Sequence, residues 1–336
     1  MRIKFVGDLM CHSSQISSYY QTKTKTYDSF KSFEYVAMSL QNANLTLGNL
    51  ETTITENSKE YSGYPRFASP TGYVHGLKKA GFDILSTANN HSADTGAKGI
   101  DTTIRIVEEN GMIPIGTYSS DIDFLNRKDL IQETNGIRIA IYNYTYSTNG
   151  IPVRDGRIVR LLNEEQIRKD VSFAKENGAH FIILWYHYGN EYEETPGTSQ
   201  TKWVKIGLDA GADIIIGGHP HVVQKIDFYE DPILNENRLI AYSLGNFISA
   251  QNRQYTDGGI ILSFTLELEL GQVTTKRIRN VETEAIWVDP RSYVILPIQR
   301  YKSRELPMLL PKHLEKRMLD YEAHIKKIPG VGSFLF

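Results

Sequence analysis

The segment DIIIGGHPHVVQ (residues 213–224) places His219 and His221 directly after an apolar run that ends in two glycines. Neutral imidazole binds divalent transition metals. Polar side chains are disfavoured in the middle of a buried strand, because an unpaired polar group costs free energy there. Glycine allows close approach of the backbone, and the intervening proline stiffens the spacing of the two imidazoles. The segment therefore predicts either a metal site at the end of a strand or a turn that contains histidine.

Four other apolar runs of the sequence also end on side chains that could bind a metal ion. They are followed by Asp8, by Glu51, by Asn90 with His91, and by His187. Each has an ordinary alternative role, as a helix cap, a solvated loop carboxylate, a turn residue or a hydrogen-bonded core histidine. In open α/β sheets, however, ligands bind in the crevice outside the carboxyl ends of the strands, where such side chains can converge. Their joint occurrence at strand ends predicts one shared site.

The donor types indicate which ions this site would take. Two ions about 3.5–4 Å apart need a bridging carboxylate and roughly three ligands each. A mixture of nitrogen and oxygen donors favours zinc, manganese or iron over magnesium or calcium. We therefore predict one or two divalent ions as the cofactor, and no nucleotide cofactor, because no phosphate-binding glycine motif occurs. The candidate ligands are Asp8, Glu51, Asn90, His187, His219 and His221.

Cys11 and His12 lie close to Asp8 and offer two further possibilities. A thiol beside an imidazole could form a nucleophilic pair, although adjacent residues rarely face each other. His12 stays a candidate ligand because of its proximity to Asp8. Since Cys11 is the single cysteine, no internal disulfide can form. The remaining histidines are expected to be structural, namely His75, His180, His313 and His324.

The order of the expected elements predicts the fold that brings the strand ends together. Helices and strands alternate through the first two thirds of the chain and strand follows strand after that, which predicts a sandwich of mixed sheets flanked by helices. Asn135-Gly136 predicts a hairpin over residues 130–146, Gly81 a helix end and Asn163 a helix N-cap. The expected strands are residues 2–8, 44–51, 82–91, 180–189, 238–248, 258–268 and 272–282, with a turn at Gly271-Gln272. The expected helices are residues 33–43, 71–81, 96–111, 163–178, 201–211 and 311–328.

The last expected helix carries an apolar stripe made of Leu314, Met318, Tyr321 and Ile325. Such a stripe at helical spacing either docks onto the protein's own surface or binds a partner helix, and we expect docking. We therefore divide the chain into a main domain, residues 1–290, and a C-terminal extension, residues 291–336, whose helix is docked on that domain.

The composition is that of a globular protein and excludes several classes. Hydrophobic residues make up 40% of the 336 and charged residues 23%, which allows a sizeable core. With a net charge of −2 we expect no nucleic-acid partner. No apolar run approaches the roughly 20 residues that cross a bilayer, and residues 1–10 resemble a strand and not a signal peptide, so the localisation stays open.

Six short blocks of the sequence occur in an order that resembles a known family. They are GDLM (7–10), NLETTIT (49–55), TANNHSADTG (87–96), WYHYGNEY (185–192), GGHPHVVQ (217–224) and YSLGNFI (242–248). Together they resemble the bacterial poly-γ-glutamate capsule-synthesis protein family (CapA-like), which is related to the calcineurin-like metallophosphoesterases. The resemblance covers about residues 2–290 and implies an α/β fold, a metallophosphatase-like sandwich of two mixed β-sheets flanked by helices (α-β-β-α).

The resemblance also implies a role for each candidate residue. Glu51, Asn90, His187 and His219 would hold one ion, Asp8, Glu51 and His221 would hold the other, and His91 would be the general acid that protonates the leaving group. Two positions depart from the metallophosphoesterase pattern: Met10 stands where the first motif has histidine, and Glu51 stands where the bridging residue is aspartate. Because a thioether is a poor ligand for a hard ion, the ion held by His221 lacks a second nitrogen ligand unless His12 supplies it. If one of the two positions holds no metal ion, we expect it to be the position that His221 serves.

Two expected loops, residues 62–70 and 144–153, would lie over the cleft. Their side chains would contact substrate or, alternatively, act as ordinary turn and packing residues. The candidates for substrate contact are Tyr64, Arg66, Phe67, Tyr144, Tyr146 and Asn149 in these loops, and Asn246 outside them.

Two functions are compatible with these observations. The first is a metal-dependent hydrolase or transferase of metallophosphoesterase type, with an anionic polymer or a small phosphorylated molecule as substrate. The second is a non-catalytic subunit of a membrane capsule synthase that binds the polymer or a partner. Members of the family are often tethered to the outer face of the cytoplasmic membrane, which implies an extracytoplasmic, membrane-associated protein, although the sequence contains no such tether.

Overall fold

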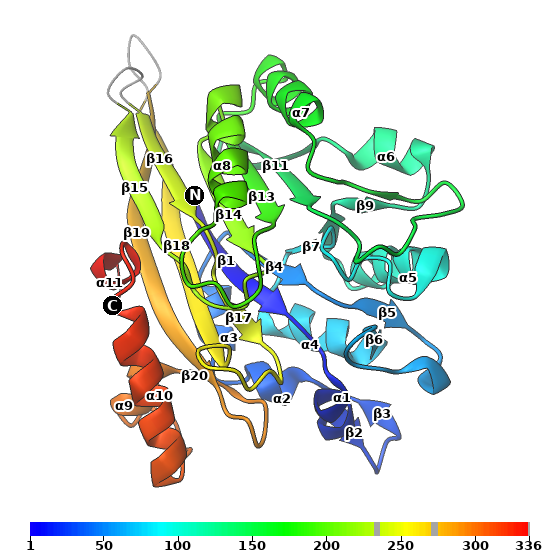
Figure 1. The fold of residues 1–336 in the computed structure, drawn as a ribbon, viewed down its shortest axis with the longest axis vertical. Coiled ribbons are helices and arrows are strands. Elements are labelled where there is room, and N and C mark those ends of the chain that lie inside the picture. The colour runs from blue at the N-terminus through cyan, green and yellow to red at the C-terminus, as the bar shows by residue number, and fades with distance from the viewer. Residues whose placement is uncertain (232–235, 270–274, 335–336) are drawn as a thin grey trace.

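Two mixed β-sheets packed face to face form the centre of the computed structural model, which describes residues 1–231, 236–269 and 275–334 (Figure 1). The first sheet consists of β1 (Arg2–Leu9), β4 (Leu45–Leu50), β7 (Ile84–Ser86), β8 (Ile113–Ile115), β17 (Asn246–Ile248), β18 (Gly258–Glu269), β19 (Thr275–Val288) and β20 (Ile295–Pro297). Its order is β20-β19-β18-β1-β4-β7-β8, with β17 also paired to β1. The strands from β1 to β8 are parallel, and those from β18 to β20 pair in antiparallel fashion.

The second sheet has four parallel strands in its middle and an antiparallel strand at each edge. Its order is β10 (Leu130–Thr134), β11 (Ile137–Thr145), β13 (Phe181–His187), β14 (Ile214–Gly218), β16 (Glu236–Ala241) and β15 (Ile226–Asp231). Asn135 and Gly136 both have positive φ angles, 53° and 75°, as the tight turn of a two-residue hairpin requires. The predicted hairpin is therefore confirmed.

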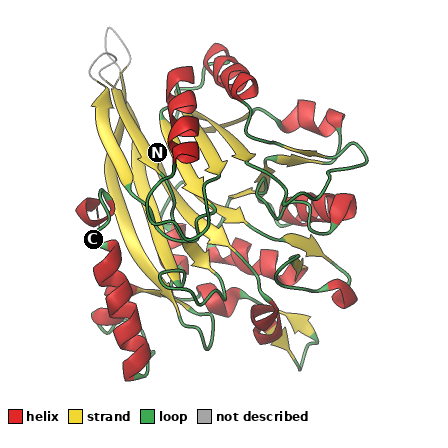
Figure 2. Ribbon diagram, viewed as in Figure 1, coloured by secondary structure: helices red, strands yellow, loops and turns green. Residues whose placement is uncertain are grey.

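Helices cover the outer faces of both sheets (Figure 2). The first sheet is covered by α2 (Phe30–Phe33), α3 (Ala37–Gln41), α4 (Thr71–Ala80) and α5 (Gly96–Glu109), and the second by α7 (Glu164–Glu176) and α8 (Thr198–Ala210). Asn163 caps α7, because its side chain accepts a hydrogen bond from the backbone N–H of Gln166, and Gly81 ends α4 at a φ of 113°. The α-β-β-α sandwich expected from the sequence is confirmed.

Shorter elements connect these layers. They are α1 (Ser13–Tyr19), β2 (Tyr20–Gln21), β3 (Thr26–Tyr27), β5 (Thr53–Thr55), a 3₁₀ turn (Ser58–Glu60), β6 (Ala68–Pro70), β9 (Thr117–Tyr118), α6 (Asp121–Arg127), β12 (Ile158–Val159), α9 (Ile298–Lys302), α10 (Lys312–Ile325) and α11 (Val331–Phe334).

Three expected elements differ from the structure. The strand expected over residues 238–248 is divided between the two sheets, since β16 lies in the second and β17 in the first, with a turn at Gly245 (φ 72°) between them. The helix expected over residues 33–43 is two short helices, α2 and α3, and the strand expected over residues 82–91 ends at Ser86. An apolar pattern identifies extended chain but not the sheet in which it pairs. The sequence prediction also missed β15, and the turn predicted at Gly271-Gln272 lies outside the described residues.

The apolar stripe of α10 is buried in the core between the sheets. Its four members belong to the same cluster as Leu266 of β18 and Trp287 of β19, and α10 lies beside β19 (Figure 1). The domain boundary at residue 290 stays a prediction.

We expect Met318→Ala to lower the free energy of unfolding by about 2–5 kcal/mol, because the fully buried side chain would leave a cavity. Chemical denaturation followed by circular dichroism measures this change. The matched control is Leu319→Ala on the same helix, whose side chain is 40% exposed and whose loss should change the free energy of unfolding by about 0.5 kcal/mol or less. Equal, small effects of both substitutions would contradict the docked position and favour a helix that awaits a partner.

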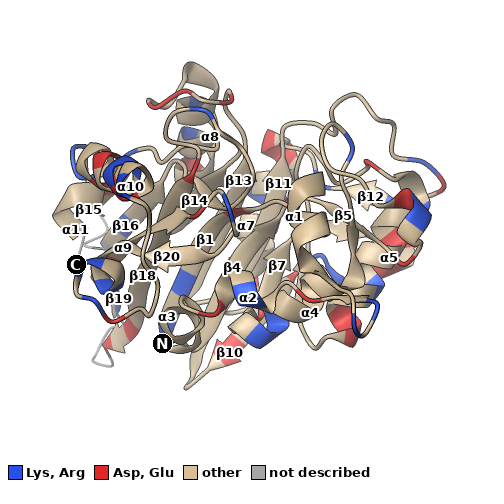
Figure 3. Cartoon of the chain, turned by 90° about the horizontal axis from the view of Figure 1, so that it is seen from below, with Lys and Arg blue, Asp and Glu red and all other residues tan. Residues whose placement is uncertain are grey.

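Lys and Arg are interspersed with Asp and Glu on the helices and loops visible in Figure 3, so that side of the molecule has no face of a single charge. Within the described residues, no helix combines the length and the apolar character needed to cross a bilayer.

Candidate metal centre

The predicted ligands converge at the carboxyl-terminal edge that the two sheets share. Three come from the first sheet, at or after the ends of β1, β4 and β7, and three from the second, at or after the ends of β13 and β14. All six are buried, with exposed fractions between 0 and 3%. They are Asp8, Glu51 and Asn90 from the first sheet, and His187, His219 and His221 from the second.

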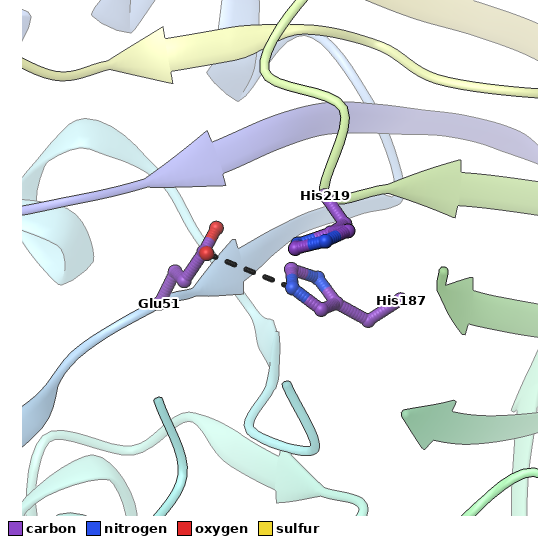
Figure 4. A group of neighbouring side chains, drawn as sticks. All are labelled: Glu51, His187 and His219. Carbon is purple, nitrogen blue, oxygen red and sulfur yellow. Dashed lines mark ion pairs between the residues drawn. The ribbon is translucent and has the colours of Figure 1, made fainter. Parts of the chain in front are cut away.

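One group of ligand atoms is formed by Glu51, His187 and His219, whose donor atoms all lie within 4.8 Å of one another. Figure 4 shows the three side chains directed toward one another, with Glu51 approaching from β4 and the histidines from the other sheet. His187 Nε2 lies 3.6 Å from Glu51 Oε1 and 2.8 Å from Asn90 Oδ1. Asn90 Oδ1 therefore lies beside this group and stays a candidate for a fourth donor.

A second group is formed by Asp8, Glu51 and His221, again within 4.8 Å. His221 Nδ1 lies 3.1 Å from Asp8 Oδ2 and 3.1 Å from Asn246 Oδ1, while the Asn246 amide nitrogen donates to the carbonyl oxygen of Thr256. Because both neighbours of Nδ1 are acceptors, Nδ1 carries the proton and Nε2, which lies 3.9 Å from Glu51 Oε1, keeps its lone pair. Glu51 is shared by the two groups.

The electrostatics of these residues fit a divalent cation. Glu51 Oε1 and His219 Nδ1 are buried without a hydrogen-bond partner, a situation that native proteins rarely leave uncompensated. Burial, reinforced by Asp8, raises the pKa of Glu51 well above its usual value. Burial lowers the pKa of His219 to about 3 and that of His187 well below its usual value, so both imidazoles are neutral at physiological pH. Neutral imidazoles and unpaired carboxylate oxygens are the donors that zinc, manganese and iron accept.

The two glycines before the histidine pair are required by close contacts with neighbouring segments. A Cβ on Gly218 would lie 2.8 Å from Asp8 Oδ1, and a Cβ on Gly217 would lie 2.0 Å from the carbonyl oxygen of Tyr242. Only glycine therefore lets β14 approach the carboxylate of β1 so closely. His219 and His221 themselves have φ angles of 96° and 59°, in the left-handed region that a side chain with a Cβ avoids. Such backbone strain is typical of functional sites.

The surroundings of Cys11 and His12 bear on the two alternatives expected around residues 10–12. Cys11 is fully buried, and burial raises the pKa of its thiol to about 12, so the thiolate that a nucleophile requires is absent at neutral pH. His12 is not a member of the candidate ligand groups found among the described residues. Its Nδ1 accepts a hydrogen bond from the backbone N–H of Ala250, and burial lowers its pKa to about 4. Met10 is buried and lines a cavity together with His12 and His221, so His12 stays a candidate for the missing nitrogen ligand.

Asn49 holds three of the candidate ligands, and sequence reasoning missed it. Its amide nitrogen lies 2.8 Å from Asp8 Oδ1, 3.4 Å from Glu51 Oε2 and 3.2 Å from His187 Nδ1. Its carbonyl oxygen accepts from Ser86 Oγ. The sequence did contain a signal, because Asn49 precedes Glu51 by two positions and residues i and i+2 of a strand share a face.

His91 is oriented by a carboxylate that sequence reasoning also missed. Its Nδ1 lies 2.7 Å from Asp94 Oδ2, which in addition accepts a 2.6 Å hydrogen bond from the backbone N–H of Phe67. The Phe67 ring packs edge-on against the imidazole, with the centroids 4.7 Å apart. With Nδ1 engaged, Nε2 is the ring atom that remains for a substrate.

Two cavities flank His91. One, of about 370 Å³, is also lined by Met10 and Arg253, and the other, of about 310 Å³, is also lined by Asn90 and Arg66. Each cavity is therefore lined by one arginine, and both cavities lie beside the candidate ligands.

Four of the seven predicted substrate contacts lie at these cavities or over the ligands. Tyr64, Arg66 and Asn149 line the smaller cavity. Tyr146 covers the histidines, because its ring centroid lies 4.7 Å from that of His219 and its ring stacks over His187 at 6.5 Å. These four stay predictions of substrate contact.

The other three, Phe67, Tyr144 and Asn246, are fully buried and take different roles. Phe67 packs against His91 and supports it. Tyr144 points to the opposite face of its strand, where its hydroxyl donates to Asp170. Asn246 orients His221. Successive residues of a strand face opposite sides, and the sequence alone did not fix which side each faced.

Comparisons with known proteins agree with this geometry. The chain matches the model described as "Bacterial capsule synthesis protein PGA_cap" over residues 2–251. It is 31% identical to "Capsule biosynthesis protein CapA" of Bacillus anthracis over 278 residues, which cover 79% of this chain and 64% of that protein, less than two thirds of its length. It is 28% identical to "PGA biosynthesis protein CapA" of Bacillus subtilis over 266 residues, which cover 78% of this chain and 67% of that protein.

A solved structure shares the fold at a much lower sequence identity. The NAD nucleotidase NadN of Haemophilus influenzae aligns with a TM-score of 0.54 at 12% identity and covers 100% of this chain and 57% of that one. This likeness confirms the sandwich of two sheets flanked by helices and nothing beyond the fold. The match to the family model over most of the chain, together with the relative from Bacillus anthracis, shows that the chain belongs to the bacterial capsule synthesis protein family PGA_cap, as the six ordered blocks predicted.

Proposed function

We propose that the chain is a metal-dependent hydrolase or transferase of capsule biosynthesis that acts on a phosphate ester or a related bond. The observation that supports this best is the pair of buried ligand groups that share Glu51 and lie beside His91. In this proposal the two ions are held by the residue sets that the resemblance implied. One set is Glu51, Asn90, His187 and His219, and the other is Asp8, Glu51 and His221.

A bound divalent ion would supply Lewis-acid activation of water and would neutralise negative charge developing on the substrate. The residues of the chain perform the remaining tasks. His91 holds the proton that the leaving group needs, and Asp94 fixes the orientation of the imidazole. Tyr146 covers His187 and His219 and limits the access of bulk water to them.

The substrate in this proposal is anionic. Arg66 and Arg253 lie in separate cavities on either side of His91, where guanidinium groups can bind carboxylate or phosphate oxygens. A stretch of capsule polymer or a small phosphorylated molecule meets this requirement. The proposed partner is a membrane capsule synthase, and the proposed location is the outer face of the cytoplasmic membrane.

The test combines metal analysis with an activity panel. We expect the purified protein to contain one or two zinc, manganese or iron ions per chain by mass spectrometry, and to hydrolyse at least one phosphate ester of a panel that includes bis-p-nitrophenyl phosphate. Removal of the metal by EDTA should abolish turnover, and addition of the same ion should restore it. A protein that binds no metal and is inert with every divalent ion supplied would sink the proposal.

The second candidate function is a non-catalytic subunit that binds the polymer or a partner. It is favoured by Met10, which stands where the metallophosphoesterase pattern has a nitrogen ligand. Binding of poly-γ-glutamate by the EDTA-treated protein with the same affinity as by the metal-loaded protein, without cleavage, would support this function over the first.

A further inference from the structure

Glu191 lies beside the histidine pair although nothing in the metallophosphoesterase pattern assigns it a role. Its carboxylate forms a third group with His219 and His221, and the three donor atoms lie within 4.8 Å of one another. It follows His187 by four positions, in the loop after β13. Unlike the other candidate ligands it is exposed, and it lines both cavities.

The loop that carries Glu191 is bound to the segment that carries the histidines. The backbone N–H of Tyr192 donates to the carbonyl oxygen of Pro220 at 2.8 Å. Pro220 lies between the two histidines, so this hydrogen bond attaches the loop to the histidine segment. The Gln224 amide donates to the carbonyl oxygen of Glu193 at 2.7 Å. Hydrogen bonds on the two residues that follow Glu191 therefore hold its loop beside the segment of His219 and His221.

Glu191 and Glu51 lie around the same imidazoles in two different environments. Glu51 is fully buried and forms one group with His219 and another with His221, whereas Glu191 forms a single group with both and is exposed to solvent. His219 Nδ1 is buried without a hydrogen-bond partner, so this nitrogen is available to bind a metal ion. The position beside His221 is also the one in which Met10 leaves a ligand missing.

We propose that Glu191 is a metal ligand, which adds a carboxylate from the solvent side to His219 and His221, beside the position that Met10 leaves without a donor. This inference rests on the proposed function, because it requires that the centre binds metal. The group of one carboxylate and two imidazoles accepts zinc, manganese or iron.

The experiment measures Mn²⁺ binding by the full chain after EDTA treatment, with free Mn²⁺ followed by electron paramagnetic resonance. The variants are Glu191→Gln and Glu191→Ala, and the matched control is Glu193→Gln, an exposed glutamate of the same loop. We expect both Glu191 variants to weaken the lower-affinity ion by about 10-fold or more, or to lose it, as removal of a metal-site residue does. Glu193→Gln should bind like the wild type.

The outcomes separate this inference from the proposed function. If the wild type binds Mn²⁺ and both Glu191 variants bind it with unchanged stoichiometry and affinity, Glu191 is not a ligand and the proposed function stands. If the wild type binds no divalent ion, both are overturned. Thermal unfolding of the metal-free proteins checks the fold, and because Glu191 is exposed, the variants should unfold at the wild-type temperature.

Discussion

Replacing His91 with alanine should lower kcat/KM of the metal-loaded protein for its phosphate ester by about 100- to 10,000-fold, the range over which a positioned general acid contributes. The structure gives the physical reason. The Nδ1 of His91 is held by Asp94 and its ring by Phe67, so Nε2 can present a proton to a leaving group in the adjoining cavities. Steady-state kinetics at saturating metal measure the change.

The bound metal serves as the internal control of this experiment, because His91 is not in the candidate ligand groups found among the described residues. His91→Ala should therefore retain the wild-type metal content. His75→Ala, an exposed histidine on α4, is the matched substitution and should keep wild-type kinetics. Unchanged kcat/KM in His91→Ala would show that the leaving group takes its proton elsewhere. A substrate with a leaving group that needs no proton, such as p-nitrophenolate, should be less sensitive to the substitution than an alkyl ester.

Replacing Glu51 with glutamine should remove both ions, the largest effect that we expect on metal content. Glu51 is the one carboxylate common to the two buried groups, and its Oε1 faces His187 at 3.6 Å and His221 at 3.9 Å. A neutral amide cannot balance the charge of two cations in a buried site. Metal analysis after gel filtration should find less than about one tenth of the wild-type content, in line with a loss of affinity of at least about 10-fold.

The stability of the metal-free protein separates loss of metal from loss of fold. Burial raises the pKa of Glu51, so above its unfolded pKa the folded state binds more protons than the unfolded state and loses stability as the pH rises. Glutamine removes this penalty, and metal-free Glu51→Gln should be at least as stable as the metal-free wild type at about pH 8. Glu56→Gln, an exposed glutamate paired with Arg105, should keep both the metal content and the stability. Full metal content in Glu51→Gln would contradict the shared-ligand position.

The candidate ligands were predictable because they follow a local rule. A polar residue that ends a buried strand is visible in the sequence, and parallel strands bring their carboxyl ends to one edge. For this reason His187, His219 and His221 could be named before any coordinates, and the structure places them together with Asp8, Glu51 and Asn90.

The residues that support the ligands were not predictable, because their positions depend on strand register. Asp8 pairs with Asn49 on β4 on one side and with Asn246 on β17 on the other, so two asparagines flank one carboxylate. Sequence reasoning assigned Asn246 to the substrate and missed Asn49. It also treated residues 238–248 as one strand, although the turn at Gly245 transfers the chain from one sheet to the other.

By itself, the sequence determined the family, the layered fold and the set of side chains that could bind metal, since apolar periodicity and the polar strand ends are written in the order of residues. Only the tertiary structure decided how these side chains are grouped. It decided which carboxylate is shared, that Tyr144 faces away from the cleft, that the Nδ1 of His12 accepts from the Ala250 backbone and that Glu191 lies beside the histidine pair. The physical reason is that grouping depends on the approach of two sheets and on loop tethers between residues such as Tyr192 and Pro220, which no local pattern encodes.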